Sequence, residues 1–144
     1  GCDHGGFLLK EEVKKHLSDR GLEFEDFGCY STESCDYPDM AERPCAAVLD
    51  GSCDFALLFC GTGIGISIAA NKHRGIRAAC CSDCFSAKFT RLHNNANVLC
   101  FGGRVVGPGL ACMMVDAFLD AEFEGGRHQR RVDKILALEE NFGK

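Results

Sequence analysis

The sequence lacks several features that would assign it to a specialised class of protein. None of its apolar runs approaches the roughly 20 residues of a membrane-spanning helix, and no signal peptide is visible. Its 16 Lys and Arg residues are outnumbered by 21 Asp and Glu, and the net charge of −5 argues against a wide basic surface for nucleic acid. Internal repeats, low-complexity segments and linkers are also missing. These absences predict one globular domain over residues 1–144, with no membrane or nucleic-acid partner.

Cysteine, by contrast, is abundant, with 11 in 144 residues. An odd count cannot pair completely within one chain, and several cysteines lie inside apolar runs, where a free thiol packs as a small hydrophobic group. We therefore expect a reduced, intracellular protein located in the cytoplasm. Cys81 and Cys84 have the spacing of a metal or redox pair, but no second pair accompanies them, which favours structural thiols over a zinc site.

Helical and strand patterns alternate along the chain. Strands are predicted over residues 23–27, 55–59, 76–81 and 98–101, and helices over 7–20, 38–50, 85–92, 110–119 and 127–141, with a short helix through 68–70. Pro44 lies inside the second helical pattern and is expected to kink that helix or delay its start. The alternation predicts an α/β fold whose parallel sheet is covered by helices on both faces.

The first six residues, Gly1-Cys-Asp-His-Gly-Gly6, have the character of a loop that leaves a strand and enters a helix. The strand itself is not in the sequence, so roughly five residues are expected to precede Gly1. Loops that follow the strands of an open parallel sheet converge on one edge. We therefore expect Asp3 and His4 to lie at the same edge as Tyr37 and the glycine-rich turn that begins at Cys60.

That turn, Cys60-Gly-Thr-Gly-Ile-Gly65, is the most specific motif in the chain and separates a buried strand from a helix. Its three glycines allow backbone N–H groups to face one point, and the helix start adds positive potential, which suits an oxyanion, a phosphate or a thiolate on Cys60. A tight turn with a buried cysteine explains the motif alone equally well. A dinucleotide site is a weaker alternative, because Ile66 stands where a third glycine is expected, although Asp83 follows at about the right distance.

Basic residues gather near the start of the last predicted helix. Arg127 and Arg131 are four residues apart, so they share a face and could grip a phosphate bidentately. A solvated helix face is the simpler interpretation of this cluster, and Arg104 is equally ambiguous. His93, next to Asn94 at a predicted helix end, fits either capping or acid–base chemistry.

Eight segments carry a more specific pattern: Gly1–His4, Asp36–Pro38, Cys60–Lys72, Gly75–Ala78, His93–Asn94, Asn97–Leu99, Gly102–Gly107 and Glu124–Gln129. Together they resemble ribose-5-phosphate isomerase type B and the sugar-phosphate isomerases grouped with it, which include galactose-6-phosphate isomerase. The resemblance covers nearly the whole chain. It implies a Rossmann-like doubly wound fold, no metal and no organic cofactor. It also implies a homodimer, or a tetramer, whose active sites draw on both subunits.

By this resemblance, Cys60 takes the place of the base that moves a proton between C2 and C1 of the open-chain sugar. Thr62 would help to hold the enediolate, while Asp3 and His93 would assist ring opening. The other implied contacts are with the enediolate oxygens (Gly61, Gly63, Ile64 and Gly65), the sugar hydroxyls (Tyr37 and Asn94) and the phosphate (His4, Arg104, Arg127 and Arg131).

The resulting expectation is a metal-independent isomerase that interconverts D-ribose 5-phosphate and D-ribulose 5-phosphate in the pentose phosphate pathway. A hexose-6-phosphate isomerase acting on galactose or allose 6-phosphate is the alternative within the same class. A nucleotide-binding or redox module that uses the glycine turn, or Cys81 and Cys84, is the alternative from a different class.

Overall fold

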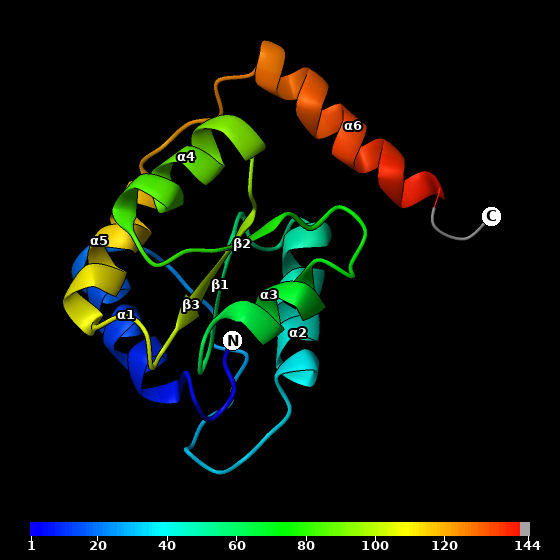
Figure 1. Cartoon of the computed structure of the whole chain (residues 1–144). Coiled ribbons are helices and arrows are strands. Elements are labelled where there is room, and N and C mark those ends of the chain that lie inside the picture. Colours follow the sequence, from blue (N-terminus) through cyan, green and yellow to red (C-terminus); the bar gives the residue numbers. More distant parts are fainter. Residues whose placement is uncertain (142–144) are drawn as a thin grey trace.

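The computed structural model describes residues 1–141, and its centre is a parallel sheet with helices on both faces (Figure 1). The three strands, β1 (Ala56–Cys60), β2 (Ala78–Cys80) and β3 (Val98–Gly102), lie in the order β1-β3-β2. The chain therefore passes from β1 to the far strand β2 and then returns to fill the centre. This reversal places the two connecting helices on opposite faces if both crossovers keep the usual right hand.

Residues 1–141 form six helices, as the apolar spacing of the sequence predicts, and the first five of them pack around the sheet. In α1 the residues Leu9, Val13 and Leu17 form one buried stripe, and the helix stops before Gly21, whose φ is +70°. The helices are α1 (Phe7–Asp19), α2 (Tyr37–Leu49), α3 (Ile64–Ala70), α4 (Cys84–Asn94), α5 (Pro108–Leu119) and α6 (Arg127–Asn141).

Alternate side chains of the strands build two separate cores. Leu58 of β1 packs with α2 and α3 residues such as Cys45 and Ile66. Phe59, the next residue, points to the other face and stacks on Phe101 of β3 at a centroid distance of 4.8 Å, in a core that includes α1, α4 and α5. The chain is therefore a single Rossmann-like α/β domain with a doubly wound sheet, as predicted.

One local prediction is wrong, and one of the two effects expected of Pro44 does not occur. No strand forms over residues 23–27: backbone hydrogen bonds join Cys2 to Gly28 and Cys29, but in the described chain no strand lies beside 23–27 to complete a ladder. The segment instead borders a cavity of about 480 Å³. Pro44 does not delay its helix, because α2 begins at Tyr37 with Pro38 in its first turn and continues past Pro44.

The last helix, α6, extends away from the sheet and packs on α4 (Figure 1). Val132 is buried, but Ile135 and Leu138 on the same helix are 42% and 57% exposed. Ile135 and Leu138 line a cavity of about 780 Å³ together with residues of the segment 71–79. Beside it, the Glu139 carboxylate accepts the N–H of Gly75 at 3.0 Å. Among residues 1–141, no helix has both the length and the apolar character needed to cross a bilayer.

Candidate active site

The Cys60 thiol lies at the carboxyl end of β1, where the glycine-rich turn leads into α3. Its side chain is 4% exposed, and its Sγ accepts a hydrogen bond of 3.1 Å from the N–H of Gly63. Gly63 has a φ of +80°, and a Cβ at this position would lie 2.7 Å from the carbonyl carbon of Phe101. Only glycine fits this conformation and this close approach, so the sequence of the turn determines the N–H donor that reaches the Cys60 sulfur.

Several other thiols lie in surroundings that oppose ionisation. Burial raises the pKa of Cys2 to about 12, and it raises the pKa of Cys45 and of Cys81 to about 11. Cys100 lies at the centre of the sheet, and its burial raises the pKa well above the ordinary value. These groups remain neutral thiols near pH 7, in agreement with a structural role.

The first loop reaches the same edge of the sheet. Backbone hydrogen bonds of 3.0 Å align Gly1–Asp3 with β1, which places Asp3 beside the end of that strand. The Asp3 carboxylate accepts the N–H groups of Gly5 and Gly6 at 2.8 and 3.2 Å. A Cβ at Gly5 would lie only 2.9 Å from the backbone nitrogen of Gly61, so this loop and the Cys60 turn are in direct contact. His4, next to Asp3, accepts the N–H of Cys35.

Two longer side chains close over the turn. The Arg104 guanidinium lies above Gly61, where an added Cβ would be 3.2 Å from Nη1, and the Arg104 N–H donates to the Gly61 carbonyl at 3.0 Å. The Tyr37 ring lies against Gly65, where an added Cβ would be 2.8 Å from Cζ. The structure thus brings together ten of the predicted residues: Asp3, His4, Tyr37, Cys60, Gly61, Thr62, Gly63, Ile64, Gly65 and Arg104.

The other four predicted residues, His93, Asn94, Arg127 and Arg131, belong to the opposite end of the strands. The α4 helix ends at Asn94, and β3 begins four residues later, whereas Cys60 is paired with Gly102 at the far end of β3. Four steps of roughly 3.3 Å along β3 place about 13 Å between these two edges. Within one chain, the predicted site residues therefore form two separate groups.

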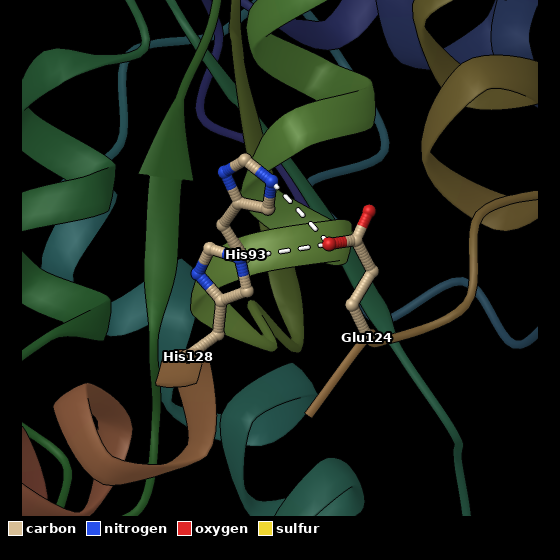
Figure 2. A group of neighbouring side chains, drawn as sticks. All are labelled: His93, Glu124 and His128. Carbon is tan, nitrogen blue, oxygen red and sulfur yellow. Dashed lines mark ion pairs between the residues drawn. The ribbon is translucent and has the colours of Figure 1, made fainter. Parts of the chain in front are cut away.

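The second group contains a cluster that the sequence analysis did not identify. His93, Glu124 and His128 converge from the end of α4, the α5–α6 linker and the start of α6 (Figure 2). One Glu124 oxygen, Oε2, lies 3.7 Å from Nε2 of His93 and 3.5 Å from Nε2 of His128. The two imidazoles stack at 4.0 Å with an interplanar angle of 8°. The four-residue spacing of Glu124 and His128 was the available signal, but nothing in the sequence placed His93 against them.

A metal ion is the first ligand to consider here, because the three donor atoms lie within 4.8 Å of one another. The stacking argues against it: ring-nitrogen lone pairs lie in the ring planes, so two parallel rings do not direct them to a common point. Arg127 and Arg131 also place positive charge beside His128. Burial, followed by the charges of His93 and Arg127, lowers the pKa of His128. The arrangement therefore favours a cluster held by ring stacking and ion-pair contacts over a cation site.

Comparison with known proteins gives the context for this geometry. A family model described as Ribose/Galactose Isomerase matches residues 1–135. A protein of Escherichia coli named ribose-5-phosphate isomerase B is 56% identical over 140 residues, which are 97% of this chain and 94% of that protein. The solved structure of ribose-5-phosphate isomerase B from Clostridium thermocellum superposes with a TM-score of 0.98 at 51% identity, covering 99% of this chain and 97% of that one.

A further solved structure contains a ligand. It is ribose-5-phosphate isomerase B from Mycoplasma genitalium with bound ribulose-5-phosphate, and it superposes with a TM-score of 0.92 at 42% identity. The match covers 96% of this chain and 93% of that chain.

Proposed function

This chain belongs to the ribose/galactose isomerase family, and we propose that it interconverts D-ribose 5-phosphate and D-ribulose 5-phosphate, with Cys60 as the base. The observation that carries the residue assignment is the buried Cys60 thiol, held at the end of β1 by the Gly63 N–H. A thiolate base requires a reducing compartment. The cysteines of this chain are all free, so we place the reaction in the cytoplasm.

The reaction moves one proton and rearranges one carbonyl group. The Cys60 thiolate removes the proton from C2 of the open-chain aldose, and the electron pair of that C–H bond forms the C1–C2 double bond of an enediolate. The carbonyl electrons move onto O1, which becomes negative. Return of the proton to C1, with transfer of the O2 proton to O1 or to solvent, leaves a ketone at C2. No electron is gained or lost overall, so the step needs no redox cofactor.

The developing negative charge would be stabilised by the turn that holds Cys60. The turn lies at the carboxyl end of β1, where the Gly63 N–H donates to the Cys60 Sγ at 3.1 Å and the Ile64 N–H donates to the Thr62 Oγ1 at 3.3 Å. The other peptide N–H groups of the turn and the Thr62 hydroxyl are the proposed donors to the enediolate. Such donors are preorganised because the turn is already fixed by Gly63 and by the Arg104 backbone contact. Each donor of this kind is typically worth about 3 kcal/mol in the transition state. Asp3 and Tyr37, at the rim of the turn, are proposed to contact the sugar hydroxyls and ring oxygen.

The separation of the predicted residues into two groups supports a shared site. An open-chain pentose phosphate spans about 8 Å from C1 to phosphorus, with six bonds of roughly 1.5 Å, and cannot connect two groups on opposite sheet edges. We infer that Cys60 of one copy meets His93, Asn94, Arg127 and Arg131 of a second copy, and that His93 assists the opening of the sugar ring there. The exposed apolar residues of α6, Ile135 and Leu138, supply surface for such a contact, so a homodimer is the smallest complete enzyme.

Replacement of the base tests the proposal directly. Cys60→Ala should lower kcat by roughly a thousandfold or more while phosphate binding and thermal unfolding stay close to those of the parent. Cys112→Ala is the matched control, because Cys112 is a half-buried thiol on α5, remote from the turn. Full activity in Cys60→Ala would refute this role of Cys60.

Substrate length needs a separate measurement, because the family model includes galactose in its description. The same coupled assay with ribose 5-phosphate, galactose 6-phosphate and allose 6-phosphate distinguishes the pentose from the hexose assignment. We expect the highest kcat/KM with ribose 5-phosphate.

A further inference from the structure

The His93–Glu124–His128 cluster has a built geometry that the proposed reaction has not used (Figure 2). The backbone holds Glu124 in place, because its N–H donates to the Leu92 carbonyl at the end of α4 at 3.0 Å. The His128 N–H donates to the Gly125 carbonyl, also at 3.0 Å, and the His128 side chain is only 7% exposed. Contacts independent of any substrate thus fix the backbone of both partners of His93, while the Glu124 side chain is half exposed.

His93 itself is restrained on several sides. The His128 ring lies parallel to it at 4.0 Å, and the Phe89 ring meets it edge-on at 4.9 Å. The Glu124 carboxylate faces Nε2 of both imidazoles. A carboxylate at this position favours a proton on the nitrogen that faces it, and so determines which nitrogen of His93 donates and which accepts.

From this geometry we propose that Glu124 and His128 are positioning residues for His93 in the opening of the sugar ring. Glu124 selects the protonated nitrogen of His93, and His128 holds the plane of its imidazole. The inference rests on the proposed function, in which His93 assists ring opening. The lowered pKa of His128, caused by burial and by the neighbouring His93, Arg127 and Arg131, leaves it neutral near pH 7. The negative charge of Glu124 is then available to His93.

Ring opening can be separated from proton transfer by the isotope effect at C2. Ribose 5-phosphate is mainly a furanose, in which O4 has added to the C1 aldehyde, so the ring must open before C2 can lose its proton. The direction of the reaction does not separate the two steps, because the ratio of forward to reverse kcat/KM equals the equilibrium constant and every variant changes both by the same factor. A defect confined to ring opening makes that step rate-limiting, so deuterium at C2 no longer slows the reaction. A defect in proton transfer keeps or enlarges the isotope effect.

The test uses Glu124→Ala, Glu124→Gln and His128→Phe, assayed on the full chain with ribose 5-phosphate that carries hydrogen or deuterium at C2. Glu122→Ala is the matched control, because Glu122 is an exposed carboxylate two residues earlier in the same linker. We expect Glu124→Ala to lower kcat/KM by roughly tenfold or more and to bring the isotope effect close to 1, because ring opening becomes rate-limiting. Glu124→Gln should lose less activity, because its amide oxygen can still face the ring nitrogen of His93. His128→Phe should also lose less activity, because a phenyl ring can still stack on His93.

The outcomes separate this inference from the proposed function. An isotope effect that stays clearly above 1 in Glu124→Ala, or unchanged activity in that variant, would overturn the positioning role. Activity retained by Cys60→Ala would instead overturn the assignment of the base, whatever Glu124→Ala does. Thermal unfolding of each variant identifies a folding defect, which would lower kcat without changing the isotope effect. Binding of Zn²⁺ to the parent that is lost in both Glu124→Ala and His128→Phe would replace the positioning role with a metal site.

Discussion

A mixing experiment offers the sharpest test of the shared site. One chain carries Cys60→Ala, which removes the proposed base, and the other carries Arg127→Ala with Arg131→Ala, which removes the proposed phosphate contacts. Each variant alone has two defective sites per dimer and should show little activity at substrate concentrations well below KM. In a hybrid dimer, one site contains the substitutions of both chains, and the other site contains only parent residues.

The expected recovery follows from the geometry and from symmetry. The two groups lie at opposite ends of β3, about 13 Å apart along the strand, so one chain cannot contribute both groups to a single substrate of about 8 Å. Random association of equal amounts makes about half of the dimers hybrid, each with one intact site of two. The mixture should therefore reach about a quarter of the parent activity.

The assay needs exchange of subunits and a direct measure of the ketose. The two variants are unfolded together and refolded, or co-expressed with different affinity tags, and the hybrid is isolated by sequential purification. Activity that stays at the mean of the two separate variants would refute the shared site, provided that the parent regains activity under the same treatment. A parent protein that sediments as a monomer at a concentration at which it is fully active would also refute the shared site.

Two further predictions concern stability. Burial raises the pKa of Asp26, but hydrogen bonds from two lysines outweigh this effect and lower it to about 2. Asp26→Asn should therefore reduce the free energy of unfolding by about 2 kcal/mol at pH 7. This difference from the parent should disappear as the pH falls from about 4 to about 2, because the parent carboxylate is then protonated. Urea unfolding at several pH values measures it. Gly63→Ala should cost at least about 1 to 2 kcal/mol because of its positive φ, with an added clash against Phe101, and should abolish activity. Gly109→Ala, where an added Cβ meets nothing within 4 Å, is its control in thermal unfolding, and an equal effect of both substitutions would contradict the explanation.

The order of elements could be predicted from the sequence because each local pattern has its own period. The stripe of Leu9, Val13 and Leu17 and the continuous apolar run before Cys60 identify a helix and a buried strand without any knowledge of their partners. The same local chemistry pointed to the Cys60 turn, since closely spaced glycines permit the positive φ found at Gly63. The segment 23–27 was predicted wrongly because a strand depends on a hydrogen-bonding neighbour, which no local pattern specifies.

The sequence by itself thus determined the α/β architecture, the strand-to-helix turn and the candidate thiol, because these depend on residues close together in the chain. Only the tertiary structure decided which distant residues meet. It joined Asp3 and Arg104 to the Cys60 turn through backbone contacts, and it placed His93 against Glu124 and His128 at the other edge. The physical reason is that strand order and helix packing set these distances, and both arise from burial of the whole core rather than from any single segment.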